Sequence, residues 1–231
     1  MLKNNSKFGF TLAEVLITLG VIGVVSAMTI PVLVQNYRNH VVETRLKKFY
    51  STFNQAIQRS ITDNGEVTTW DYFSNTGNNM KADEIKSKFN KYLRPYMNII
   101  DEKMFEDSEG RSFIVYYLPD GSAFAYNSNH IRDVFFFPKN VDKIIVSSNL
   151  NSIRGNSCWV FVFMPLQNNV YWKYHYNKGL EPNLYDWDGN ESSLYEGEKD
   201  LNCKDTGVYC TAIIQHNGWK VPKNYPRKIK F

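Results

Sequence analysis

The 231-residue sequence has few of the features on which enzymes and metalloproteins depend. It contains only three cysteines, and its four histidines are scattered singly, with no pair spaced to share one helix face. It lacks a Gly-x-Ser-x-Gly elbow, a phosphate-binding loop, a dinucleotide fingerprint and a His-Glu-x-x-His motif. We therefore predict a protein that is not an enzyme and that has no cofactor and no metal site.

An excess of charge of one sign is also absent. The 27 Lys and Arg residues against 23 Asp and Glu residues give a formal net charge of +4, spread along the chain. This balance does not predict nucleic-acid binding. Hydrophobic residues make up 43% of the chain and aromatic residues 15%, so a core can form, and the length allows one domain plus an anchor.

The longest stretch without charge is residues 15–34. A helix of this length can cross about 30 Å of hydrocarbon, so a single membrane span is predicted. Lys3 and Lys7 precede the stretch, which favours an N-terminus on the cytoplasmic side, but a basic cluster also follows it. Charge counting alone therefore leaves the topology open.

Two processing sites compete at this end of the chain. A secretory signal would be cleaved after the apolar stretch, at the small residues Val25-Ser26-Ala27. The other site lies before the stretch, between Gly9 and Phe10. Glu14 distinguishes the two, because a secretory segment gains nothing from a carboxylate at its head.

Residues 7–14 (KFGFTLAE), with the apolar stretch that follows, resemble the prepilin signal of type IV pilins and type II secretion pseudopilins. Gly9, Phe10, Glu14 and Pro31 match the family pattern. The resemblance implies cleavage by prepilin peptidase after Gly9, N-methylation of Phe10 and a kink at Pro31. It also implies partners: identical or related subunits, a secretion or pilus assembly machinery, and the inner membrane, with the head in the periplasm or outside the cell.

Elementary electrostatics gives Glu14 a role in such a protein. In the precursor the nitrogen of Phe10 is a neutral amide, and after cleavage it becomes an α-amine with a pKa near ~8. A charge at the centre of a membrane costs about 2.5–3.5 kcal/mol, much of which a partner relieves. The resemblance implies that the partner of Glu14 is the N-terminal amine of a neighbouring subunit. The alternative is a glutamate that only snorkels to the interface.

Apolar residues continue at helical spacing beyond the membrane stretch. Leu46, Phe49, Phe53 and Ile57 form a stripe, so one long helix is predicted from about Phe10 to about residue 60. The predicted organisation is a leader at 1–9, an apolar helix half at 10–34, an amphipathic half at 35–62 and a globular head at 63–231.

In the head, helix is predicted first and strands later. The helix is expected at 82–96, and a hairpin at 112–118 and 123–126 around Asp120-Gly121. Further strands are expected at 143–147, 158–164, 170–176 and 209–215, with a hairpin from the last of these into 219–221. The predicted fold class is α+β: a long N-terminal helix packed on an antiparallel sheet, as in pilins.

Cys203 and Cys210 enclose a short loop and suit an oxidising compartment. A disulfide between them would resemble the C-terminal disulfide loops of many pilins. Cys158 lies in an apolar run, where it is a buried thiol or the partner of either other cysteine.

Two further segments suggest binding. Residues 186–191 (DWDGNE) carry oxygen ligands at alternate positions but fail the calcium-loop pattern, so a solvated acidic turn is predicted. The alternation in the aromatic run 171–176 predicts that one face points inward as core, either Tyr171/Lys173/His175 or Trp172/Tyr174/Tyr176. The alternative is a sugar- or surface-binding platform. The predicted function is a structural subunit of a pilus or pseudopilus. The alternatives are an anchored or secreted binding protein, for example for carbohydrate, that uses its N-terminus only for export, and then an anchored hydrolase.

Overall fold

The computed structural model describes residues 9–73, 80–106, 110, 112–127, 130–147, 150–197 and 201–231. It divides into two compact units, Met1–Arg38 and Asn39–Phe231, and helix α1 (Leu12–Asn64) runs through both. Most of the predicted leader, including Lys3 and Lys7, lies outside the described residues. The predicted division at residues 9, 34 and 62 stays a prediction.

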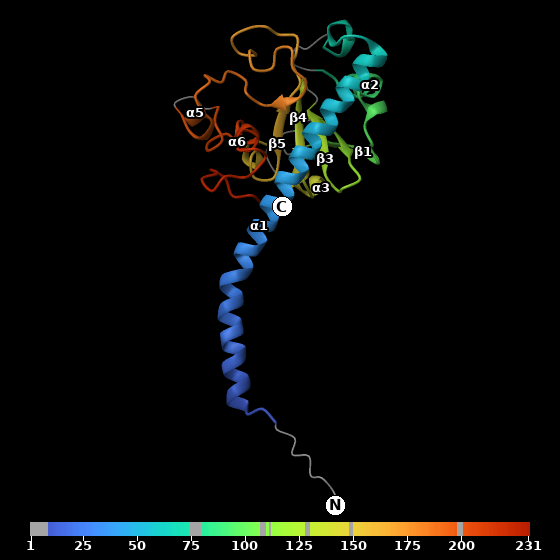
Figure 1. Ribbon diagram of the computed structural model, residues 1–231. Coiled ribbons are helices and arrows are strands. Elements are labelled where there is room, and N and C mark those ends of the chain that lie inside the picture. Colours follow the sequence, from blue (N-terminus) through green and yellow to red (C-terminus); the bar gives the residue numbers. More distant parts are fainter. Residues whose placement is uncertain are drawn as a thin grey trace, which may run out of the picture. The chain divides into compact units, whose positions relative to one another are not determined.

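The first unit consists of the N-terminal part of α1 and the residues before it (Figure 1). This part of the helix is long and apolar enough to cross a membrane, and its apolar window is not buried within the structure. Pro31 lies inside α1, and the helix continues on both sides of it. The kink predicted at Pro31 stays a prediction.

The second half of α1 belongs to the head and has one buried face. The predicted stripe is confirmed, because Leu46, Phe49, Phe53 and Ile57 are all 2% exposed or less. These positions are three or four residues apart and therefore lie on one side of the helix. The helix begins two residues later than predicted and ends at Asn64, where Gly65 follows with φ of 77°.

The stripe packs on a six-stranded sheet in which each strand pairs antiparallel with the next along the chain. The strands are β1 (Asp101–Glu106), β2 (Ser112–Tyr117), β3 (Ala123–Asn127), β4 (His130–Phe137), β5 (Trp159–Val162) and β6 (Glu181–Pro182). The predicted turn at Asp120-Gly121 joins β2 to β3 and pairs Tyr116 with Phe124. This is the predicted α+β, pilin-like architecture.

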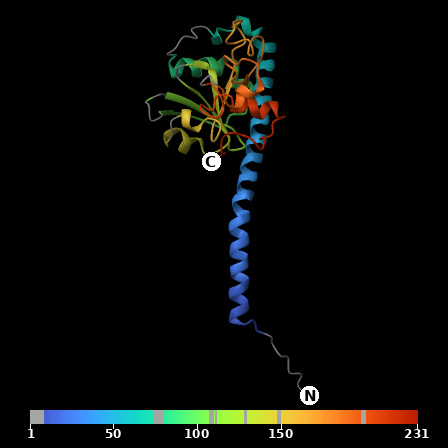
Figure 2. The same ribbon diagram turned by 90° about the vertical axis from the view of Figure 1, so that its left-hand side faces the viewer.

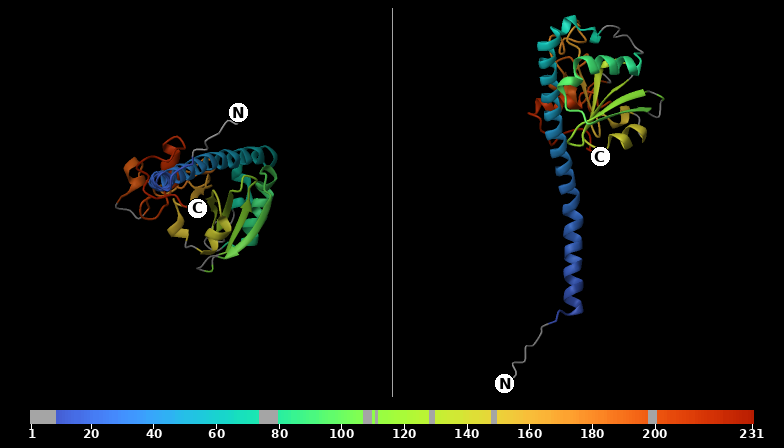
Figure 3. Two further views of the ribbon diagram at one scale, coloured as in Figure 1. Left: turned by 90° about the horizontal axis from the view of Figure 1, so that it is seen from below. Right: turned by 90° about the vertical axis from the view of Figure 1, so that its right-hand side faces the viewer.

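The two faces of the sheet are covered by different helices. Along β2, Ile114 and Tyr116 belong to the cluster that contains α1 and α2 (Ala82–Tyr92), whereas Phe113 and Val115 pack with α3 (Val141–Ser147). This alternation is the period of two expected of a strand. Figure 2 and the right panel of Figure 3 show the second half of α1 on one side of the strands and α3 on the other.

The C-terminal region adds short helices and loops. These are α4 (Leu150–Ile153), α5 (Glu191–Tyr195) and α6 (Cys210–His216). Three single 3-10 turns, Val67–Thr69, Asp71–Phe73 and Arg94–Tyr96, lie earlier, between α1 and β1. A third apolar cluster joins α5, α6 and the Cys203 loop.

Three predicted strands are wrong. Residues 143–147 belong to helix α3, where Val141, Ile144 and Ile145 are buried at the helical spacing of three and four. Residues 209–215 lie mainly in helix α6, in which residues 210–214 are all buried. Such a short apolar run has no exposed position to reveal its period. Residues 170–176 form consecutive turns.

Smaller differences concern ends and edges. The helix predicted at 82–96 ends at Tyr92, because Pro95 has no N–H to donate to the Lys91 carbonyl and its ring would clash with that carbonyl. A 3-10 turn that contains Pro95 follows. Residues 219–221 are irregular rather than half of a hairpin. The sequence did not predict β1, whose charged residues suit an exposed edge, nor β4 and β6.

Candidate functional site

The start of α1 is fixed by Thr11 and Glu14. The Thr11 backbone N–H and its hydroxyl both donate to Glu14 Oε2, each at 2.8 Å, and the Glu14 N–H donates to Thr11 Oγ1 at 3.2 Å. This is a capping box, the reciprocal arrangement that satisfies the open N–H groups of a first helical turn. The Thr-x-x-Glu spacing was visible in the sequence, but Glu14 was interpreted there as a charge that pairs with an amine or snorkels to the interface, and not as a cap.

The predicted cleavage site lies immediately before this cap. Gly9 and Phe10 precede the helix, and Phe10 is 89% exposed. Among the described residues, and apart from Gly9 and its chain neighbours, none has an atom within 4 Å of the point where a side chain on Gly9 would begin. A peptidase could therefore reach the Gly9–Phe10 bond without unwinding α1.

Beyond the cap, α1 presents apolar side chains to its surroundings on every side. Exposed fractions of its leucine, isoleucine, valine and methionine side chains between Leu12 and Val34 run from 40% to 78%. A continuous apolar surface of this kind marks a site for lipid or for other helices. The first half of α1 therefore suits a membrane and a helical bundle equally well.

In the head, Cys203 and Cys210 form a disulfide with Cα atoms 4.6 Å apart, and Cys158 is a buried free thiol. Arg227 holds the disulfide loop from outside. Its Nε donates to the Cys203 carbonyl at 2.6 Å, and its two terminal nitrogens donate to the carbonyls of Arg154 and Asp205. The loop is thus closed covalently and fixed to the C-terminal segment.

Removing this disulfide with the double variant Cys203→Ser/Cys210→Ser is expected to lower the free energy of unfolding by about 2.5 kcal/mol. The sulfur atoms close a loop with a sequence separation of 7, and the estimate is the chain entropy that such a loop removes from the unfolded state. Chemical denaturation of the full chain in detergent measures the loss. A reductant should destabilise the wild type equally and leave the double variant unchanged; equal stability of all three would contradict the prediction.

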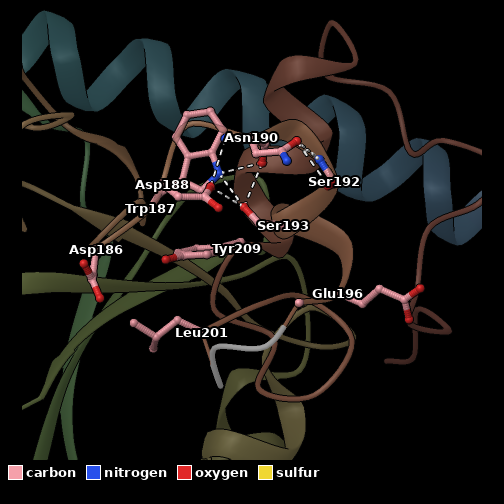
Figure 4. Close-up of a pocket in the computed structure, with 10 residues that line it drawn as sticks. Asp186, Trp187, Asp188, Asn190, Ser192, Ser193, Glu196, Leu201 and Tyr209 are labelled. Carbon is pink, nitrogen blue, oxygen red and sulfur yellow. Dashed lines mark hydrogen bonds between the residues drawn. The ribbon is translucent and has the colours of Figure 1, made fainter.

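The predicted acidic turn borders a cavity of about 330 Å³ between α5 and the disulfide region (Figure 4). Asp188 Oδ1 accepts hydrogen bonds from the Asn190 N–H at 2.9 Å and the Ser193 hydroxyl at 2.6 Å. The side chain of Glu196 extends away from Asp186 in Figure 4. In the part of the chain that the structure describes, no group of three acidic, histidine or cysteine residues is arranged to hold a metal ion.

The aromatic run 171–176 does not have the predicted alternation of one core face and one exposed face. Because the run consists of turns, burial does not alternate: Trp172 and His175 are buried, while Tyr171 and Lys173 are exposed. Tyr171 stacks on Tyr185 with ring centroids 5.7 Å apart. Neither of the two alternate faces predicted from a strand exists.

Comparisons with known proteins match two family models along the chain. A model described as "Family of unknown function (DUF6613)" matches residues 32–229. A second model, the prokaryotic N-terminal methylation motif, matches residues 4–30 and confirms the prepilin-type signal predicted from the sequence. No curated protein and no solved structure matches the chain.

Proposed function

Because the chain belongs to the family of unknown function DUF6613 and carries a prokaryotic N-terminal methylation motif, we propose that it is a structural subunit of a type IV pilus or type II secretion pseudopilus. The methylation motif is the observation that carries this proposal. The motif extends into the apolar half of α1, and the second half of α1 packs in a head of α+β, pilin-like architecture.

In the proposed maturation, prepilin peptidase cleaves after Gly9 and the new N-terminus, Phe10, is N-methylated. Cleavage converts an amide into a cationic amine, which keeps its charge on methylation. Glu14 of a neighbouring subunit is the counter-ion, and desolvation strengthens their attraction in the membrane. The apolar half of α1 then packs among the same helices of other subunits.

The proposed location of the unassembled subunit is the inner membrane, crossed once, with the head on the periplasmic side. The charge-free residues 15–34 supply the span. The Cys203–Cys210 disulfide supports a head outside the cytosol, because disulfides persist in oxidising compartments. After assembly the head would lie on the outside of the filament.

Mass spectrometry of the mature N-terminus tests the processing. We expect a chain that starts with N-methylated Phe10. A chain that starts at Met28 would show a secretory signal and favour the exported binding protein instead. An intact Met1 would show that no prepilin processing takes place.

Assembly is tested by separating the two roles of Glu14. Glu14→Gln keeps an acceptor for the capping box but removes the charge, whereas Thr11→Val removes the cap and keeps the charge. If charge pairing drives assembly, Glu14→Gln should be processed yet lower the sheared filament yield about tenfold or more, since lost ion pairing of 1.4 kcal/mol already gives this factor. Thr11→Val should assemble within about threefold of the wild type. Normal assembly by Glu14→Gln would contradict the charge-pairing role.

A further inference from the structure

The exposed side of α1 in the head borders a long groove. Two adjoining hollows of about 640 and 420 Å³ share Lys47, Ser51 and Trp219 as lining residues. The first also touches Tyr50 and Arg59, among others. The groove thus runs between the outer face of α1 and the loop after α6, entirely within Asn39–Phe231.

The helical wall of the groove is a ladder of polar side chains that winds gradually around α1. Lys47, Ser51, Gln55 and Arg59 are each four positions apart, and all are exposed. At a rise of 1.5 Å per residue the ladder is about 18 Å long. The opposite side of the same helix is the buried stripe, so the ladder is the face that the head leaves uncovered.

The groove is basic. Lys48 pairs with Asp120, and Lys220 pairs with Glu43, both at 2.8 Å. Among the residues that the structure describes, Lys47 and Arg59 form no ion pair. The groove therefore offers a cation near each end of the ladder to a partner that brings carboxylates.

Trp219 forms the other wall in an unusual conformation. Its φ is 64°, in the left-handed region that bulky residues rarely adopt. The conformation is held by the Trp219 N–H, which donates to the Ile214 carbonyl at 2.8 Å, and by the Tyr50 ring 5.0 Å away. Such strain concentrates at binding surfaces, and tryptophan is among the residues that dominate interface energies.

The same chain carries a surface of opposite charge. The acidic turn, α5 and the residue after it contain Asp186, Asp188, Glu191 and Glu196, of which the last three are exposed. Glu196 pairs with Lys204, so Asp188 and Glu191 are the carboxylates offered to a partner. Among the described residues that line the cavity there, none is a lysine or an arginine. These carboxylates lie in the segment 186–196, whereas the groove is built from α1 and the loop after α6.

We propose that the groove of one subunit binds the acidic segment 186–196 of a second copy of this chain. Lys47 and Arg59 then face carboxylates of the neighbour, and Trp219 packs against its turn. Since the two surfaces lie on different parts of one molecule, the contact is heterologous, the class of contact that builds an open filament when the rotation between copies does not close a ring. The inference rests on the proposed function and names one contact between heads in the filament.

Photocrosslinking of the full chain, expressed in its own host with the assembly machinery, tests the contact. Gln55→p-benzoylphenylalanine places the probe in the middle of the ladder. We expect an adduct between two copies whose mass-mapped partner peptide contains residues 186–196. Lys47→Glu/Arg59→Glu should lower the adduct about tenfold, as should Asp188→Lys/Glu191→Lys, because like charges then oppose each other.

The decisive variant combines all four reversals in one chain and should restore the adduct to within about twofold of the wild type, since it recreates opposite charges. Lys228→Glu/Lys230→Glu is the matched control: it makes the same charge change at two exposed lysines outside the groove and should leave the adduct unchanged.

Three outcomes would overturn the inference. The first is that the double reversals leave the amount of adduct unchanged. The second is that the fourfold variant fails to restore the adduct. The third is that the crosslinked partner is a different protein, or a segment of this chain other than 186–196. The proposed function is scored separately by the methylated N-terminus and by filament yield. If the wild type is methylated and forms filaments but the charge reversals do not change the amount of adduct, only the proposed contact between heads is refuted.

Discussion

Phe49→Ala is expected to lower the free energy of unfolding by about 3–5 kcal/mol, the usual cost of truncating a fully buried phenylalanine. Phe49 is 2% exposed and stacks on Phe136 with ring centroids 4.6 Å apart. Its ring also lies 5.3 Å from Phe124 and 5.5 Å from Phe161. These partners come from β3, β4 and β5, so one side chain joins α1 to three strands.

Urea denaturation of the full chain in mild detergent, followed by near-UV circular dichroism, measures this loss. Tyr171→Ala is the matched control, because it removes an aromatic ring that is 48% exposed and should cost less than about 1 kcal/mol. A loss below 1 kcal/mol for Phe49→Ala would show that α1 contributes little to the stability of the head. Other side chains of α1 would then hold this helix against the sheet.

Long amphipathic patterns were the part of the fold that the sequence could predict. The buried stripe from Leu46 to Ile57 spans three helical turns, and only a helix places all of its members on one side. The hairpin around Asp120-Gly121 was equally clear, because Gly121 adopts a φ of 77° that the turn requires. Both features are local, so the sequence contains all the information that specifies them.

Short segments failed because tertiary packing decides their conformation. Ile144, Ile145 and Val146 favour a strand by propensity, yet the segment packs two of them against the sheet as a helix. In α6 the adjoining disulfide and the surrounding cluster restrict the chain more than the preferences of its residues do. Strand β1 was not predicted because its charged residues do not show the apolar alternation of a half-buried strand.

The N-terminal motif and the groove beside α1 also differ in how far the sequence alone could predict them. The N-terminal motif is contiguous, so Gly9, Phe10 and Glu14 could be identified from their spacing. The groove is not contiguous: the bond between Lys220 and Glu43 that borders it joins residues 177 positions apart. No pattern along the chain brings Trp219 beside α1, and only the fold does.

Acidification from pH 6.5 to 4 is expected to destabilise the head by about 3 kcal/mol through His175 alone. The His175 side chain is fully buried, and its Nε2 accepts a hydrogen bond from the Leu184 N–H at 3.1 Å. Burial, with a smaller effect of the Lys178 charge, lowers the pKa of His175 from 6.5 to about 4. A protonated ring would also lose the acceptor that fixes Leu184.

The direction follows from proton binding in the two states. Between pH 4 and pH 6.5 the unfolded chain binds a proton at His175 that the folded chain does not, so this contribution is complete above pH 6.5 and is lost as the pH falls. A difference of about 2.5 units between the pKa values of the folded and unfolded states corresponds to about 3 kcal/mol.

His175→Gln can keep an acceptor for the Leu184 N–H but cannot titrate. Denaturation curves across this range should therefore be steeper in pH for the wild type than for His175→Gln, while His40→Gln, at an exposed ring on α1, should follow the wild type. Equal pH dependence of stability in the wild type and His175→Gln would show that His175 accepts its proton in the folded head as readily as in the unfolded chain. Any acid sensitivity of the head would then come from another titrating group.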